Sequence, residues 1–515
     1  MVFTSTVFLF AFLPVALVAF YLFPAGLRAW PLLVLSALFY GWGEPILVVL
    51  ILFSAVLNFT FGRLLSRPGL ARSRDWLVLG IVLNLVPLLV FKYLEWFLVT
   101  LGLDGLAAGV ALPLPIGVSF YTFMAISYLV DIHRGRNMGA PSLLMFGAYL
   151  TMFPHLVAGP IVRWGHVGPQ LRRPTFNPGL FGYGAVRVAT GLVKKAVLAD
   201  SISPVVDALF GSGAPTSWGS AWVAVLLYSL QIYLDFSAYS DIAIGLAAIL
   251  GVRFEENFRY PYVSRSAREF WQRWHVSLGS WFRDYVYIPL GGSRVRPALL
   301  WRNLLVVWAL TGLWHGAAWT FVLWGVYFGV LIGLERGALG RAVDRLPRFL
   351  QHGYGVLVVA IGWVLFRSES LLQASEYYRA MSGLSSAPMW DARATYAISQ
   401  TLVVAAIATL LSASAARRVM EMTERFFLQH QEVHPWPVDH RHRPAPIHVP
   451  EGAPDAAHAA GRVATATEPE APPAEPPARL RGWSLVAGLA VATLLLIGTS
   501  FVVSVTYSPF IYFRF

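Results

Sequence analysis

Two histidines occur in apolar segments rich in tryptophan. His315 lies in WALTGLWHGAAWTFVLW (residues 308–324), where the small residues at 316–318 leave space beside the imidazole. Such a histidine is either a hydrogen-bonded structural group or a base that takes a proton from a hydroxyl near neutral pH, and the residues alone leave both open. Because the apolar run continues over residues 304–334, we expect His315 inside an apolar helix with no loop near.

The second histidine, His275, lies in REFWQRWHVSLGSWFRDYVYIPLGG (residues 268–292), which mixes charged residues with tryptophan and tyrosine. This composition predicts an amphipathic helix. One interpretation is a surface helix anchored by aromatic rings at the lipid headgroups. The other is a helix that brings His275 to the site as a second polar group.

A third polar cluster lies in YLDFSAYSDIAIG (residues 233–245). Asp235 and Tyr239 are four residues apart and share a helix face, as do Ser237 and Asp241. Two carboxylates in an apolar span indicate a supporting polar network, a proton path or an ion site, and the network is the default.

A lysine and a glutamate also occur within an apolar run. Lys92 and Glu95 are three residues apart, so we expect them to pair with each other near an interface. We assign them no role.

The elements that must position these groups are membrane helices. The chain has 515 residues, of which 57% are hydrophobic and 13% charged, whereas soluble proteins carry about 25% charged residues. Apolar runs recur at about 20 residues, the length that crosses a bilayer. The sequence predicts an all-α integral membrane protein with on the order of ten to twelve spans, some of them re-entrant, such as residues 141–160. The chain has no cysteine, which excludes thiol and disulfide chemistry.

Charge predicts the orientation. Four arginines between residues 63 and 74 predict a cytoplasmic loop and an extracytoplasmic N-terminus. The net charge of +12 is assigned to such loops and not to nucleic-acid binding. We divide the chain into a transmembrane core (1–430), a disordered cytoplasmic linker rich in Pro, Ala and His (431–480), and a last span with an extracytoplasmic tail (481–515). The linker histidines have no fixed geometry, so no metal site is predicted.

The tail ends in TYSPFIYFRF. Its rings suit an aromatic belt that anchors the last helix. Tyr512 also suits a covalent acyl carrier, because an activated phenol can accept an acyl group. Both interpretations stay open.

Five segments carry a family resemblance over about three-quarters of the chain. They are PIGVSFYTF (115–123), FPHLVAGPIVR (153–163), YLDFSAYSDIAIG (233–245), NFRYPYVSRSAREFWQRWHVSLGSWFRDYVYIPLGG (257–292) and LTGLWHGAAWTFVLWG (310–325). With these motifs the chain resembles the membrane-bound O-acyltransferase family, most closely its bacterial branch that serves O-acetylation of exopolysaccharides such as alginate. The resemblance does not extend over residues 431–480.

The resemblance implies a ring of helices around a central funnel in the bacterial inner membrane. It maps the family's signature histidine to His315, as the base, and a second histidine to His275, for positioning or for the oxyanion. It implies acetyl-CoA as acyl donor, with no bound cofactor or metal, and an extracytoplasmic SGNH-hydrolase-like acetyltransferase partner that modifies the polysaccharide.

Two alternatives remain at this stage. The acceptor could be cellulose, peptidoglycan or teichoic acid. In another class of protein, a membrane transporter, Asp235 and Asp241 would line a transport path.

Overall fold

The computed structural model describes residues 1–503 except 111, 137–138, 212, 413 and 429–490. The linker 431–480 and Tyr512 therefore lie outside the described residues. Every regular element in the described part is a helix, which confirms the predicted all-α class.

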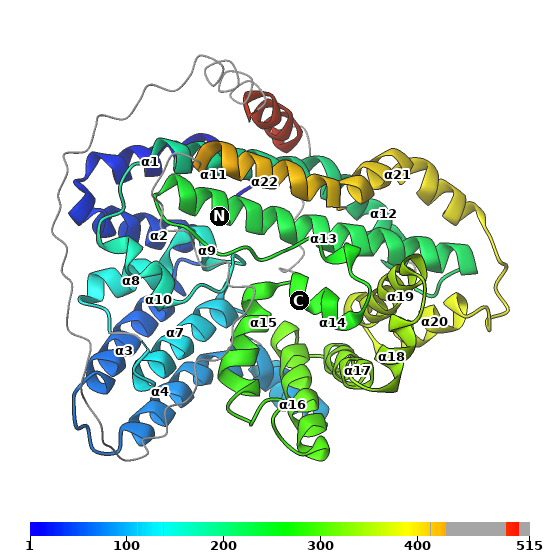
Figure 1. Cartoon of the computed structure of the whole chain (residues 1–515), viewed down its shortest axis with the longest axis horizontal. Coiled ribbons are helices and arrows are strands. Elements are labelled where there is room, and N and C mark those ends of the chain that lie inside the picture. Colours follow the sequence, from blue (N-terminus) through cyan, green and yellow to red (C-terminus); the bar gives the residue numbers. More distant parts are fainter. Residues whose placement is uncertain (111, 137–138, 212, 413, 429–490, 504–515) are drawn as a thin grey trace, which may run out of the picture.

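The N-terminal third forms a helical group, drawn in blue and cyan in Figure 1. Its main helices are α1 (Leu13–Leu22), α2 (Ala29–Gly43), α3 (Val48–Leu65), α4 (Ser73–Leu88), α7 (Val118–His133) and α8 (Leu143–Thr151). Helix α7 is buried along nearly its whole length and packs against α3 and α4. The amides of Asn58 and Asn84 exchange two hydrogen bonds of 2.8 Å, which pair polar groups that lipid could not satisfy.

The longest helix, α13 (Trp218–Ile249), crosses the middle of the molecule (Figure 1), and its residues 231–249 are all buried. It packs along α11 (Pro178–Leu192), the π-helix η5 (Val193–Ala199) and α12 (Asp200–Gly211). Glycines allow this approach: a Cβ added to Gly184 would lie 2.6 Å from the carbonyl oxygen of Gly245. Small residues at such crossings are typical of membrane helix packing.

A third group lies against α13 and carries both histidine segments. It contains α14 (Ala267–Arg273), α15 (Val276–Phe282), α16 (Pro297–His315), α17 (Trp319–Glu335) and α19 (Arg348–Arg367). The apolar run over 304–334 is not one helix, because the chain turns back after His315 and α16 and α17 form a tight hairpin. The hairpin is tight because a Cβ on Gly325 would lie 2.1 Å from the carbonyl oxygen of Trp308.

The other elements are short or peripheral. The α-helices are α5 (Leu94–Thr100), α6 (Asp104–Gly109), α9 (Phe153–Leu156), α10 (Trp164–Val167), α18 (Ala338–Asp344), α20 (Leu371–Met381), α21 (Ala392–Leu411) and α22 (Ser414–Leu428). The π-helices are η1 (Phe8–Phe12), η3 (Leu89–Tyr93) and η7 (Arg283–Tyr287), and the 3-10 helices are η2 (Ala25–Leu27), η4 (Gln170–Arg172) and η6 (Pro261–Val263).

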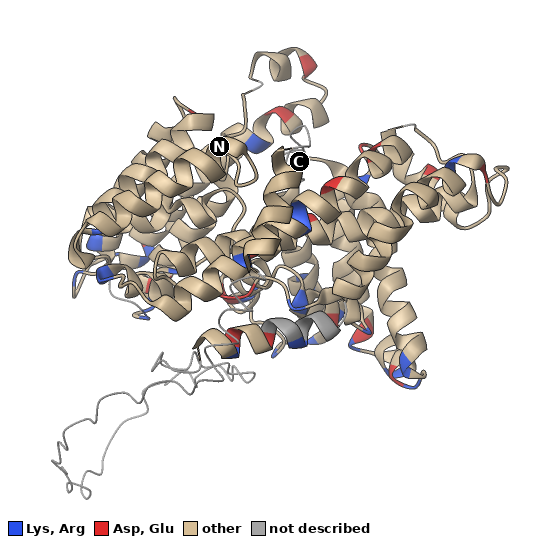
Figure 2. Ribbon diagram, turned by 90° about the horizontal axis from the view of Figure 1, so that it is seen from above, with Lys and Arg blue, Asp and Glu red and all other residues tan. Residues whose placement is uncertain are grey.

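Several helices are long and apolar enough to cross a membrane. Among the described residues five qualify, and a sixth if α17 and α18, bent by 71°, form one span. Shorter apolar helices include Phe8–Leu22, Ala29–Gly43 and Val491–Val503. The chain is therefore a multi-pass membrane protein, whereas the number of ten to twelve spans stays a prediction. Figure 2 shows most Lys and Arg positions toward the edge where α22 lies, as expected for one basic face of a membrane protein.

Candidate active site

His315 is the last residue of α16 and is buried, with 4% of its surface exposed. The expectation that no loop is near was wrong: the helix ends here because Gly316 takes an extended conformation (φ −162°, ψ 151°). The imidazole centroid lies 4.9 Å from that of Trp314, 5.0 Å from Trp324 and 5.1 Å from Phe366. A side chain at a helix end, enclosed by aromatic rings, is both rigidly held and shielded from water.

His275 precedes α15 as its N-terminal cap and is buried. Its backbone is left-handed (φ 45°), which is uncommon outside glycine and costs on the order of 1–3 kcal/mol. The imidazole lies 4.8 Å from the Phe236 ring and 5.9 Å from the Trp314 indole. Because Trp314 also contacts His315, the fold brings the two histidines to the same indole.

The side chain of Asn257 fixes His275. Its Oδ1 accepts hydrogen bonds from the Ser277 backbone N–H (3.2 Å) and hydroxyl (2.9 Å), and lies 3.1 Å from His275 Nδ1. The backbone N–H identifies this end of the amide as the oxygen, so Nδ1 must carry a proton. A neutral ring held this way presents an unprotonated Nε2, which accepts hydrogen bonds.

Sequence reasoning missed Asn257, although the residue lies in a quoted motif. Its amide also donates to the Ser240 hydroxyl of α13 (3.1 Å), so one side chain links the long central helix to the start of α15. A buried asparagine after an apolar helix was the available signal, since such an amide must find partners.

Several buried polar atoms around the histidines have no hydrogen-bond partner among the described residues. They are His275 Nε2 and the indole N–H groups of Trp271, Trp314 and Trp324. Leaving such a group unpaired costs about 1–3 kcal/mol. Three donors and one acceptor thus lie unpaired among aromatic rings in the described part of the chain.

The predicted network of Asp235, Tyr239 and Asp241 separates into two parts. Asp241 pairs with Arg187 (2.5 Å) and Lys194 (2.6 Å), and Asp235 pairs with Lys195 (2.9 Å).

Arg187 also pairs with Glu256, and Lys195 with Asp200 (2.8 Å). The two aspartates therefore join α13 to the basic residues of α11 and η5. Sequence reasoning did not select these cations because they lie about 40 to 54 residues before the aspartates in the chain.

Tyr239 has other neighbours: its ring stacks on Phe3, with centroids 4.7 Å apart, and its hydroxyl bonds to the backbone of Ala158.

The expected pair of Lys92 and Glu95 is not formed. Lys92 Nζ instead donates to the carbonyl oxygens of Trp314 (2.5 Å) and His315 (3.2 Å). The neighbouring Tyr93 hydroxyl donates to the carbonyl of Leu313 (2.7 Å). The lysine therefore belongs to the surroundings of His315.

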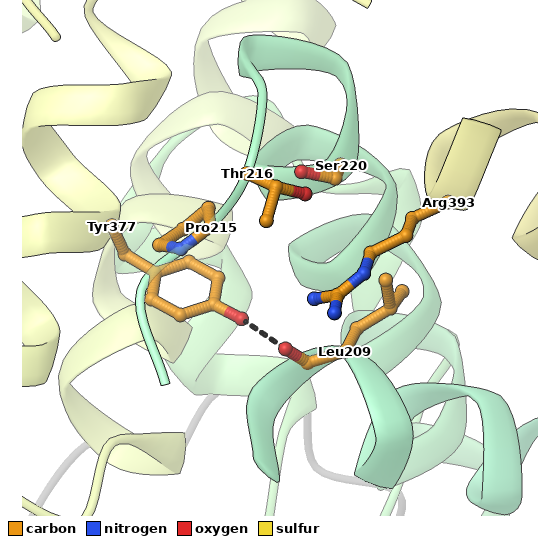
Figure 3. A pocket seen from close by; sticks show the side chains of 6 residues that line it. All are labelled: Leu209, Pro215, Thr216, Ser220, Tyr377 and Arg393. Carbon is orange, nitrogen blue, oxygen red and sulfur yellow. Dashed lines mark hydrogen bonds between the residues drawn. The ribbon is translucent and has the colours of Figure 1, made fainter. Parts of the chain in front are cut away.

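A small pocket lies elsewhere, between α12, α20 and α21 (Figure 3). It is lined by Leu209, Pro215, Thr216, Ser220, Tyr377 and Arg393, and the Tyr377 hydroxyl donates to the carbonyl of Leu209 (3.1 Å). It contains neither histidine, so we do not assign the chemistry to it.

Two buried histidines that share one indole, in a helical membrane fold, are the features to compare with known protein families. The membrane-bound O-acyltransferase (MBOAT) family model matches residues 85–353, a range that includes both histidines. The chain belongs to this family. It is a multi-pass membrane O-acyltransferase, and the transporter interpretation is set aside.

Individual members of the family are similar to this chain over most of its length. The chain is 41% identical to the probable alginate O-acetylase AlgI of Azotobacter vinelandii over 394 residues, covering 74% of this chain and 78% of that protein. It is 36% identical to the probable alginate O-acetylase AlgI of Pseudomonas syringae pv. tomato over 100% of both chains. It is 30% identical to the peptidoglycan O-acetyltransferase of Helicobacter pylori over 426 residues, 75% of this chain and 80% of that protein.

Proposed function

We propose that this protein is the membrane O-acetyltransferase of an alginate-modifying system in the bacterial inner membrane, with acetyl-CoA as its donor. The observation that carries the mechanism is the pair of buried histidines on the Trp314 indole. The acceptor is taken from the similar alginate O-acetylases, which are 36–41% identical, against 30% for the peptidoglycan enzyme.

In the proposed reaction His315 is the base. It removes the proton of the acceptor hydroxyl while that oxygen attacks the thioester carbonyl. The tetrahedral oxyanion collapses, the C–S bond breaks, and the CoA sulfur leaves with the proton that His315 took. Oxygen is acetylated, thiol is released, and His315 returns to its neutral state.

The other polar groups divide the remaining work. Of the two roles expected for His275, the geometry favours positioning, because an Nε2 without a proton accepts a hydrogen bond from a hydroxyl and cannot donate one to an oxyanion. The indole N–H groups of Trp314 and Trp324 are the nearby donors for the oxyanion.

The path of the acetyl group is part of the proposal. The basic edge seen in Figure 2 is assigned to the cytoplasm, where the donor is made. The acetyl group leaves on the opposite side, to an SGNH-hydrolase-like partner that acetylates the polysaccharide. Tyr512, in the extracytoplasmic tail, is proposed as the intermediate acyl carrier.

The function is tested in an alginate-producing strain that lacks its own membrane acetylase. The wild-type chain is expected to restore O-acetyl groups to alginate, measured by NMR of the purified polymer. His315→Ala is expected to restore none at equal protein level, since loss of a base costs about 10²–10⁴ in rate. Acetylation by His315→Ala above about a tenth of wild type would reject the assigned base. If the alginate stays unmodified and peptidoglycan is acetylated instead, the acceptor is peptidoglycan and not alginate.

The relay is tested by a pair of substitutions. Tyr512→Phe removes the hydroxyl and is expected to stop alginate acetylation, because a relay needs that oxygen. Phe513→Tyr, the matched control, keeps ring size and is expected to have no effect. Normal acetylation in Tyr512→Phe would leave the tail as an aromatic anchor.

A further inference from the structure

The C-terminal end of α16 carries three carbonyl groups that its own helix cannot satisfy. A helix leaves its last carbonyls without intrahelical donors. In α16 the N–H of Gly316 still bonds to Gly312 (3.3 Å), and the chain is extended beyond that point. The carbonyls of Leu313, Trp314 and His315 need donors from elsewhere.

All three donors come from two adjacent residues of one neighbouring span. Lys92 bonds to the carbonyls of Trp314 and His315, and Tyr93 bonds to that of Leu313. Both residues belong to the π-helix η3, which follows Pro87 within the span Ser73–Thr100. Pro and π-turns are the usual causes of a local change in helix direction, and here they coincide with the two capping residues.

The two caps differ in charge. Tyr93 supplies a neutral hydrogen bond. Lys92 supplies an ammonium at the negative end of the α16 dipole, and its Nζ lies 6.0 Å from the centre of the Trp314 ring. A lysine at membrane depth is costly unless it serves a site, whereas a tyrosine or methionine would cap or pack there at less cost.

The immediate surroundings of His315 combine titratable groups with uncharged rings. His275 lies on the same Trp314 indole as His315, and Lys92 donates to the His315 carbonyl. The rings that face His315 from α17 and α19, Trp324 and Phe366, are uncharged.

We propose that Lys92 is the positioning residue of the active site: its ammonium holds the last two carbonyls of α16 and thereby fixes His315 for proton transfer. This role rests on the proposed function of His315. A displacement of about 1 Å at a reacting group can cost about 10² in rate, so the backbone at His315 has to be held as firmly as its ring.

The test compares two caps of the same helix end. Lys92→Met removes the charged cap and keeps a chain of similar length, and Tyr93→Phe removes the neutral cap. The full-length variants are expressed, and transfer of labelled acetyl from acetyl-CoA is measured in membrane vesicles that contain them. The thermal stability of each variant is measured on the purified protein.

A positioning role predicts different results for the two variants. Lys92→Met should lower kcat by at least about tenfold, with KM for acetyl-CoA changed less than about twofold. Tyr93→Phe should keep kcat within about threefold of wild type, although both variants lose a few degrees of melting temperature, roughly in parallel. If Lys92→Met does not accumulate in the membrane, Lys92→Gln, which also lacks the charge, is expected to show the same loss of kcat.

Two outcomes would overturn the proposal. One is a kcat within about threefold of wild type in a folded Lys92 variant. The other is an equal fall of kcat in Lys92→Met and Tyr93→Phe, as expected of caps that only stabilise the helix.

His315→Ala, measured alongside, separates this proposal from the proposed function. If His315→Ala is active, the assignment of His315 as the base is rejected, and with it the proposed function of the site. If His315→Ala is inactive and Lys92→Met is active, the role of Lys92 is rejected and the proposed function stands.

Discussion

Two regions of this protein bury polar side chains at membrane depth, and they treat them in opposite ways. Around Asp241 the charges meet opposite charges, on Arg187 and Lys194, at 2.5 and 2.6 Å. Around Trp314 the polar groups, apart from the ammonium of Lys92, are uncharged donors and acceptors, several of them unpaired among the described residues. A polar group in an apolar span is thus no sign of chemistry by itself; the signal is a buried group for which the described residues supply no partner.

The largest difference between the regions should appear in the rate of acetyl transfer. His275→Ala is expected to lower the rate by about 10² or more, because an acceptor at the reacting hydroxyl is lost. Its melting temperature should fall as well, because the hydrogen bond from Nδ1 to Asn257 is lost, so the rate is compared per folded molecule. Acetyl transfer and thermal unfolding of the purified protein measure the two quantities.

The matched control is another buried histidine. His155 contacts the carbonyl of Tyr149 through Nε2 (2.9 Å) and lies outside the site. His155→Ala should lower stability and leave the rate per folded molecule near that of wild type. If His275→Ala and His155→Ala lower the rate per folded molecule to the same extent, the contrast between the two histidines is wrong.

Substitutions in the ion-paired region around Asp241 should lower the stability strongly and the rate little. Arg187→Met leaves Asp241 and Glu256 without their shared cation, and breaking a buried pair from one side costs about 3–5 kcal/mol. This is a large part of a typical stability of about 5–15 kcal/mol, so the amount of folded protein should fall steeply. The rate per folded molecule should stay within about threefold.

The smallest effect is expected for an ion pair outside both regions. Glu269 and Arg273 form an i,i+4 pair at 2.9 Å, about a quarter exposed, and such pairs contribute about 0.3–0.5 kcal/mol. Glu269→Gln should leave stability and rate close to wild type. A loss as large as that of Arg187→Met would mean that burial does not decide the energy of these pairs.

Part of this arrangement could be predicted from the sequence. Hydrophobic runs predicted the helical membrane class, and residue types selected His275, His315 and the aspartates of α13. The break after His315 was missed because Gly316–Ala318 are small and apolar, so hydropathy does not mark the turn; the close glycine contacts of the hairpin depend on pairing in space.

Partners distant in sequence were missed for the same reason. Lys92 looked like the mate of Glu95 because only neighbours along one helix are visible in a sequence. Its carbonyl partners lie about 220 residues away. Backbone acceptors also carry no residue signature, so no pattern of types could have indicated that the lysine caps α16.

The π-turn η3 has a consequence for how such a site can arise. A π-turn holds one more residue than the α-helical turn it replaces. Losing a single codon within residues 89–93 would restore a regular helix and turn the preceding span by about 100° relative to α5. Lys92 and Tyr93 would then no longer both face the end of α16. One insertion in an ancestral gene is therefore enough to direct a lysine onto the active site, or away from it, with the span as apolar as before.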